Sequence, residues 1–166
     1  YEVPDGAAVA INSRTGEILA FAEHSTRSPG RHVALATEPP AASIFKVITA
    51  AALLELAGLE PDLETCYHGG ASRITEALLT PNAQRDRRCA TLSVALGRSI
   101  NVIFARLADQ HLTGAQIDQM ARAFGFGADV DFDLPLDPSR IEIPGERLER
   151  ARTAAGFWHS HISPLH

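Results

Sequence analysis

The chain has 166 residues, which is enough for one domain with a core of its own. Its composition, 45% hydrophobic and 21% charged, excludes disordered, collagen-like and low-complexity proteins. A net charge of −5 without a basic block argues against a nucleic-acid partner, and the absence of a run of about 18 apolar residues predicts no transmembrane helix. Of the 15 Lys and Arg residues 14 are Arg, so Lys46 is the only lysine.

The first third of the chain predicts a hairpin followed by a buried helix. Two short apolar runs, 7–11 and 18–22, flank a polar turn that contains a glycine, which is typical of a β-hairpin. Neither run alternates cleanly, so we expect both faces of the hairpin to be covered. Residues 23–40 contain several prolines and predict a loop. Residues 41–57 are almost all apolar and end at a glycine, which predicts a helix that is buried on nearly every side.

The rest of the chain predicts further helices packed closely through small side chains. The sequence has 27 alanines but only 6% aromatic residues, a composition that favours a core of close-packed helices. Residues 60–90 are polar and mixed, and their pattern gives no assignment. A capping box at Thr113–Gln116 marks one helix start, and Ser163-Pro164 predicts another close to the end of the sequence. The predicted helices span 92–96, 102–111, 113–124 and 146–155, with a loop over 126–145.

Ser43 and Lys46 stand near the start of the predicted buried helix, three residues apart. Residues at this spacing share one helix face, so the hydroxyl and the amine can meet. Burial lowers the pKa of a lysine, and a neutral amine can accept the hydroxyl proton, which an arginine cannot. The first turn of a helix also favours an oxyanion through its free N–H groups and its dipole. The alternative is a lysine that reaches the surface and a serine that caps the helix.

Ser99 and Asn101 lie in the break between two predicted helices. A loop in such a place can present both side chains to a cleft. The alternative is an ordinary helix break in which one of the two residues caps the second helix.

Together these residues resemble the penicillin-binding protein transpeptidase domain, a family with Ser-x-x-Lys, Ser-x-Asn-type and Lys-Thr-Gly motifs. The resemblance implies a mixed α/β fold of the β-lactamase and transpeptidase type, here with an N-terminal β-hairpin and a mostly helical region. It covers most of the chain, and the segments that carry it are 6–20, 38–46, 91–105, 124–127, 133–135 and 163–166.

The resemblance assigns a role to each of the four polar residues. Ser43 would attack the D-Ala-D-Ala end of a peptidoglycan stem peptide and form an acyl-enzyme, and β-lactams would acylate the same serine. Lys46 would take the serine proton, Ser99 would pass a proton to the leaving amine, and Asn101 would bind the substrate amide. No cofactor or metal is implied. The family places the reaction on the periplasmic, extracytoplasmic face of the bacterial inner membrane, with any membrane anchor outside this segment.

One family motif is missing, because a chain whose only lysine is Lys46 has no Lys-Thr-Gly segment. That strand also supplies an oxyanion-hole N–H, so its loss is expected to reduce catalysis. We therefore expect residues 1–166 to be part of a transpeptidase domain, without the last strands of its sheet and inactive or impaired. The hairpin edge that those strands leave exposed would be free for self-association with another chain.

Two other functions remain open at this point. A serine β-lactamase or DD-carboxypeptidase shares the Ser-Lys chemistry and uses water as acceptor. The segments 133–135 and 163–165 favour the transpeptidase over these enzymes. A non-catalytic domain that binds or senses penicillin would keep the fold without the reaction.

The two cysteines, Cys66 and Cys89, allow either one disulfide in an oxidising compartment or two inert thiols. A zinc site that includes His68 lacks a fourth ligand at suitable spacing, so we expect no metal. Trp158 receives no functional assignment from the sequence.

Overall fold

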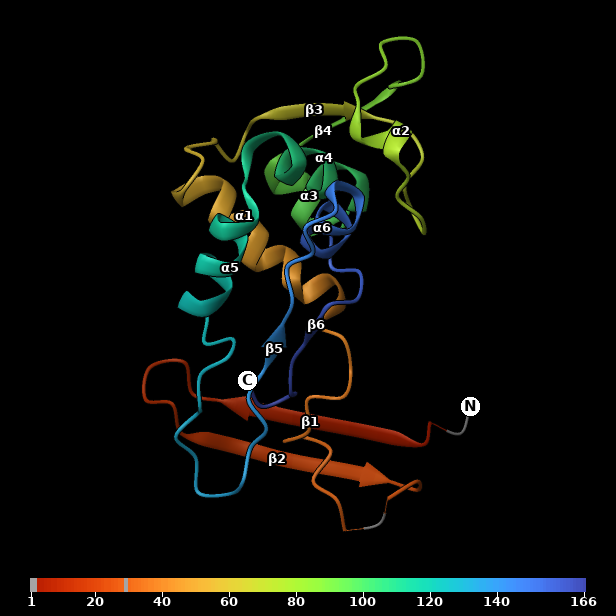
Figure 1. The fold of residues 1–166 in the computed structure, drawn as a ribbon. Helices are drawn as coiled ribbons and strands as arrows, with labels where there is room; N and C mark the ends of the chain where they lie inside the picture. The colour runs from red at the N-terminus through yellow and green to blue at the C-terminus, as the bar shows by residue number, and fades with distance from the viewer. Residues whose placement is uncertain (1–2, 29) are drawn as a thin grey trace.

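The predicted hairpin is present at the N-terminal end of the chain. In the computed structural model, which describes residues 3–28 and 30–166, strands β1 (Asp5–Ile11) and β2 (Ile18–Ser25) pair antiparallel (Figure 1). The turn is closed by the Asn12 N–H, which donates to the Glu17 carbonyl at 2.8 Å. Gly16 adopts φ +75° in this turn, a backbone angle that side chains with a Cβ rarely tolerate.

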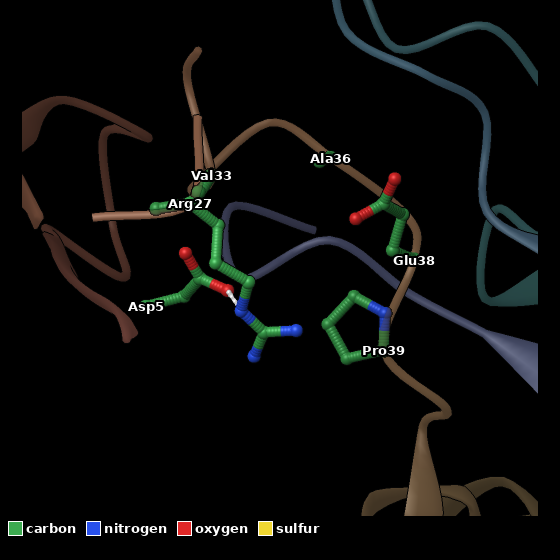
Figure 2. Close-up of a pocket in the computed structure, with 6 residues that line it drawn as sticks. All are labelled: Asp5, Arg27, Val33, Ala36, Glu38 and Pro39. Atoms are coloured by element: carbon green, nitrogen blue, oxygen red, sulfur yellow. Dashed lines mark ion pairs between the residues drawn. The ribbon is translucent and has the colours of Figure 1, made fainter. Parts of the chain in front are cut away.

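The expectation that both faces of the hairpin are covered is wrong. Neither described strand contains a buried residue, and Leu19 is 64% exposed. The hairpin crosses one end of the helical region as a two-stranded sheet, and within residues 3–28 and 30–166 neither strand pairs with a third (Figure 1). An ion pair between Asp5 and Arg27 at 3.0 Å links the hairpin to the following loop, on a hollow of about 260 Å³ that Ala36 and Pro39 also line (Figure 2).

The buried helix predicted over 41–57 is confirmed, with an altered first turn. A 3₁₀ turn (Ala42–Ile44) leads into α1 (Phe45–Glu55), and Ala42 has φ +48°, which is incompatible with a regular helix at that residue. The helix runs through the middle of the molecule (Figure 1). The side chain of Thr49 donates to the carbonyl of Ala154 at 2.7 Å and ties α1 to a helix near the end of the chain.

Four helices surround α1 and confirm the prediction of a helical core. The central one is α4, with seven of its 11 residues buried. The capping box at Thr113 forms and opens α5, as predicted. The helices are α3 (Leu92–Gly97), α4 (Asn101–His111), α5 (Gly114–Ala123) and α6 (Arg147–Ala154), close to the predicted ranges.

The unassigned segment 60–90 forms a small antiparallel ladder. Strands β3 (Glu64–Tyr67) and β4 (Arg88–Thr91) pair so that Cys66 lies directly opposite Cys89, and the two sulfurs form a disulfide. The short helix α2 (Glu76–Leu79) lies in the excursion between them. Each strand has four residues, too few for a periodic pattern to be recognised in the sequence.

A buried guanidinium fixes this excursion to the core. Arg106 of α4 is 1% exposed and donates to the carbonyls of Cys66 and Leu78 and to the carboxylate of Asp86. Asp86 also accepts from the ring of His68 at 2.5 Å, and its pKa stays well below the ordinary value through hydrogen bonds from the Asn82 N–H, His68 and Arg106, despite opposing desolvation. A buried charge needs such partners to be tolerated.

The last part of the chain returns toward the start of α1. Strands β5 (Arg140–Ile141) and β6 (Ser160–His161) pair antiparallel, and the N–H of Ala41 donates to the carbonyl of Ser160 at 2.8 Å. The hydroxyl of Ser163 accepts from the His166 N–H at 3.1 Å, a cap-type hydrogen bond, but residues 163–166 form no helical turn. Among the described residues, no helix combines the length and the apolar character that crossing a bilayer requires.

Candidate active site

The hydroxyl of Ser43 is hydrogen-bonded to two other predicted site residues. Its Oγ accepts a hydrogen bond from the Lys46 amine at 2.8 Å and another from the Ser99 hydroxyl, also at 2.8 Å. Ser43 is exposed while Lys46 lies beneath it. The arrangement leaves the hydroxyl open to a ligand and places a basic group behind it.

Lys46 is buried, so the alternative in which it reaches the surface is wrong. Its side chain is 1% exposed, and burial lowers the pKa of the amine from 10.5 to about 8. About one-tenth of the amine is then neutral at pH 7, against less than one-thousandth for an ordinary lysine. A buried lysine with this pKa can act as a general base near neutral pH.

Two residues at the hydroxyl cluster have unusual backbone angles. Ala42 and Ser99 adopt φ +48° and +54°, the left-handed region that residues other than glycine seldom occupy. Such angles concentrate at functional sites, where the surrounding structure has to enforce them.

Gly156 is a site residue that the sequence analysis missed. A Cβ at this position would lie 2.2 Å from the carbonyl oxygen of Ala42 and 3.2 Å from the Ser43 nitrogen. Its φ of +86° also favours glycine. The backbone after α6 therefore rests directly on the peptide that carries Ser43, a contact between distant residues that the sequence shows only as a helix-ending glycine.

Asn101 is the first residue of α4, and its amide donates to the carbonyl of Ala71 at 2.6 Å. The N-cap of this helix is Ile100, without a side-chain hydrogen bond, so neither Ser99 nor Asn101 caps it. Asn101 thus links the Ser99 turn to residues 69–74 of the excursion. Its role toward a substrate amide stays a prediction.

The cysteines do not form a metal centre in this structure. Glu64 approaches Cys66 and Cys89, but both sulfurs are taken by the disulfide and are not thiolate ligands. His68 is paired with Asp86.

Comparison with known proteins places the chain in a family. The family model described as penicillin binding protein transpeptidase domain matches residues 6–166. No curated protein matches the chain significantly.

Solved structures share the fold at low sequence identity. A peptidoglycan glycosyltransferase from Burkholderia ambifaria is 22% identical, with a TM-score of 0.74 over 96% of this chain and 49% of its own. The D,D-transpeptidase domain of a peptidoglycan glycosyltransferase from Eggerthella lenta is 23% identical, with a TM-score of 0.72 over 92% of this chain and 42% of its own. Penicillin-binding protein A from M. tuberculosis, solved as a ceftriaxone acyl-enzyme complex, is 24% identical, with a TM-score of 0.68 over 84% and 32%.

The chain thus spans half or less of the length of these relatives, and its mixed α/β fold is theirs. Because the family match takes in nearly every residue, the chain belongs to the penicillin-binding protein transpeptidase domain family.

Proposed function

We propose that the chain carries the nucleophile of a peptidoglycan DD-transpeptidase, with Ser43 as the residue that is acylated by a D-Ala-D-Ala stem peptide or by a β-lactam. The observation that supports it most is the pair of 2.8 Å hydrogen bonds that join the Ser43 hydroxyl to Lys46 and Ser99. As in the family, the reaction would take place outside the cytoplasm.

In the proposed reaction, Ser43 Oγ attacks the carbonyl carbon of the penultimate D-Ala while its proton passes to the neutral Lys46 amine. The tetrahedral intermediate collapses by breaking the bond to the terminal D-Ala. The leaving nitrogen takes a proton from the Ser99 hydroxyl, which recovers one from Lys46. An amine of a second stem peptide then attacks the ester, forms the cross-link and returns the proton to Ser43.

The missing Lys-Thr-Gly segment limits what these 166 residues do alone. Removing one oxyanion-hole donor from a serine enzyme lowers its rate by about 10²–10³-fold. We therefore expect acylation of this chain to be slow. Stoichiometric labelling at ordinary rates would show that the third motif is dispensable.

The test is labelling with a fluorescent penicillin, followed by mass spectrometry of the labelled peptide, on this chain and on any longer protein that includes it. An adduct on Ser43 that disappears in Ser43→Ala and Lys46→Arg supports the proposal. Ser93→Ala is the matched control, because this exposed serine only donates to the Pro61 carbonyl. Equal labelling of the Ser43→Ala variant, or no label on any of these proteins, would overturn it.

The fate of the adduct separates the remaining alternatives. Release within seconds would indicate a serine β-lactamase or a DD-carboxypeptidase with water as acceptor. Reversible binding without an adduct would indicate a non-catalytic domain that senses or binds penicillin.

A further inference from the structure

The side chain of Asn101 is held by a segment that lies far from it in the sequence. Asn101 is the first residue of α4, and its side-chain N–H donates to the carbonyl of Ala71 at 2.6 Å. Within residues 3–28 and 30–166, this is the one hydrogen bond that the Asn101 side chain makes. The second amide N–H and the amide oxygen are therefore available to a ligand, while the first N–H fixes the plane of the amide.

The peptide between Gly70 and Ala71 packs directly on the first turn of α4. Gly70 has φ +73°, and a Cβ at this position would lie 2.5 Å from the Cβ of Val102, the residue that follows Asn101. Carbon atoms that are not bonded do not approach so closely, so only a glycine lets the backbone reach the helix here. This contact sets the position of the Ala71 carbonyl relative to Asn101.

The segment that contains this peptide is anchored on both sides by arginines. The carbonyl of Cys66 accepts from the buried guanidinium of Arg106 at 2.7 Å. The carbonyl of Ile74, whose side chain is fully buried, accepts from Arg152 at 2.6 Å. Residues 68–75 form neither helix nor strand, so these anchors and the contact of Gly70 with α4 are what hold the peptide in place.

We propose that the Gly70–Ala71 peptide fixes the orientation of the Asn101 amide for the amide of an acyl donor, with Gly70 as a positioning residue of the reaction. This role rests on the proposed function, because Asn101 has a donor amide to bind only if the chain takes a stem peptide or a β-lactam. Ser99, two residues before Asn101, donates to Ser43, so the oriented amide belongs to the same turn as the partner of the nucleophile. A change at Gly70 should therefore weaken recognition of the donor amide and spare the serine chemistry.

Two probes that differ only in the donor amide measure this effect. One is benzylpenicillin, and the other is the same molecule with its side-chain amide carbonyl reduced to a methylene group. We would follow acylation of Ser43 by each probe with mass spectrometry of the intact protein. The ratio of the two rates is the preference for the amide, and dividing it by the wild-type ratio cancels the different intrinsic reactivities of the probes.

Gly70→Ala should lower the preference for the amide about 5-fold, the effect of losing one well-placed hydrogen bond. Gly69→Ala is the matched control, because it also adds a Cβ at a positive φ, but this Cβ meets only the flexible side chain of Leu78 at 3.5 Å. It should keep the wild-type preference. Asn101→Ala should lose the preference as Gly70→Ala does, and combining the two substitutions should lower it no further. An unchanged preference in Gly70→Ala, or a further loss in the double variant, would overturn the positioning role.

Ala71→Gly provides a second test that does not crowd the helix and covers the case in which Gly70→Ala does not fold. It removes an exposed methyl group and loosens the backbone that carries the carbonyl, so the preference should fall about 3-fold. Ala83→Gly, an exposed position in a turn of the same excursion, should leave the preference unchanged. A wild-type preference in Ala71→Gly would overturn the role as well.

Failure of the positioning role and failure of the proposed function give different results. In the Ser43→Ala chain, which cannot be acylated, benzylpenicillin should shift the NMR signal of the Asn101 side-chain amide more than the methylene analogue does, and Gly70→Ala should remove this difference. A chain that is acylated at Ser43, but in which neither the preference nor the Asn101 signal responds to Gly70→Ala, retains the function and loses the positioning role. A chain whose Asn101 signal distinguishes the probes in this way, but that is never acylated, retains the positioning role and loses the function.

Discussion

At the scale of single residues, the proposed chemistry depends on one buried amine. Lys46 lies one turn from Ser43, and the hydrophobic helix around it lowers its pKa. The meeting of Ser43 with Lys46 could be predicted from their spacing, since a helix fixes which side chains share a face. The contact of Gly156 with Ala42 could not, because it joins residues far apart in the chain and depends on how α6 ends.

The lowered pKa of Lys46 makes a prediction about stability. Below about pH 8 the amine is charged in both the folded and the unfolded chain, and the folded state bears the desolvation cost. Between pH 8 and 10.5 the unfolded chain holds a proton that the folded chain has released, so folding becomes more favourable with pH. Relative to Lys46→Met, the wild-type free energy of unfolding should rise by about 3 kcal/mol from pH 7 to pH 10.5, measured by urea denaturation. A difference that stays constant across this range would contradict it.

The Gly156→Ala substitution is expected to reduce activity more than it reduces stability. Gly156→Ala and Gly58→Ala both place a Cβ at a positive φ, which costs about 1 kcal/mol at either position, and the contact with the Ala42 backbone adds to that cost at 156. The alanine at 58 meets open space, whereas the one at 156 presses on the Ala42 carbonyl and displaces Ser43. Labelling of Ser43 should therefore slow at least about 10-fold in Gly156→Ala only, since small misplacements of a nucleophile have large effects. Equal labelling rates in two folded variants would argue against this role.

At the scale of elements, the helices were predictable and the short strands were not. Apolar spacing and the capping box at Thr113 mark α1 and α5 in the sequence, because these signals are local. The ladder of β3 and β4 depends instead on Arg106, which reaches from α4 to the carbonyl of Cys66. Tertiary contacts of that kind leave no periodic pattern in the residues they position.

The disulfide between β3 and β4 predicts a measurable contribution to stability. It closes a loop with a sequence separation of 23, and the entropy removed from the unfolded chain by such a loop corresponds to about 3 kcal/mol. A variant with Cys66→Ala and Cys89→Ala should lose about this amount in guanidinium denaturation. Reductant should destabilise the wild type to the same level and leave the variant unchanged. A wild type that is indifferent to reductant would contradict the prediction.

At the scale of the whole molecule, the hairpin is the least integrated part. The sequence correctly predicts its two strands but not their exposure. The same apolar run occurs in a strand whether or not another layer covers it. Coverage is a property of the assembled fold, and here the sheet has two strands.

The exposed hairpin predicts concentration-dependent self-association through its strand edges. Apolar side chains such as Leu19 lie beside unpaired edges, and a charge there should oppose edge-to-edge pairing. In sedimentation velocity at about 100 µM, Leu19→Lys should shift the chain toward monomer. Val94→Lys is the control, because it changes an exposed apolar residue on helix α3. Identical profiles for the two variants would rule out the hairpin as the contact.

The exposed hairpin and the buried helix α4 are expected to differ in the free energy at which their backbone hydrogen bonds open. The strand hydrogen bonds of 5–25 are protected only by each other, whereas those of α4 are enclosed by the core. In the monomer, amide hydrogens of the hairpin should exchange through local opening, and those of α4 only through global unfolding. The turn that carries Ser43, the proposed nucleophile, leads into the buried helix α1, so we expect it to remain in place while the hairpin opens and closes.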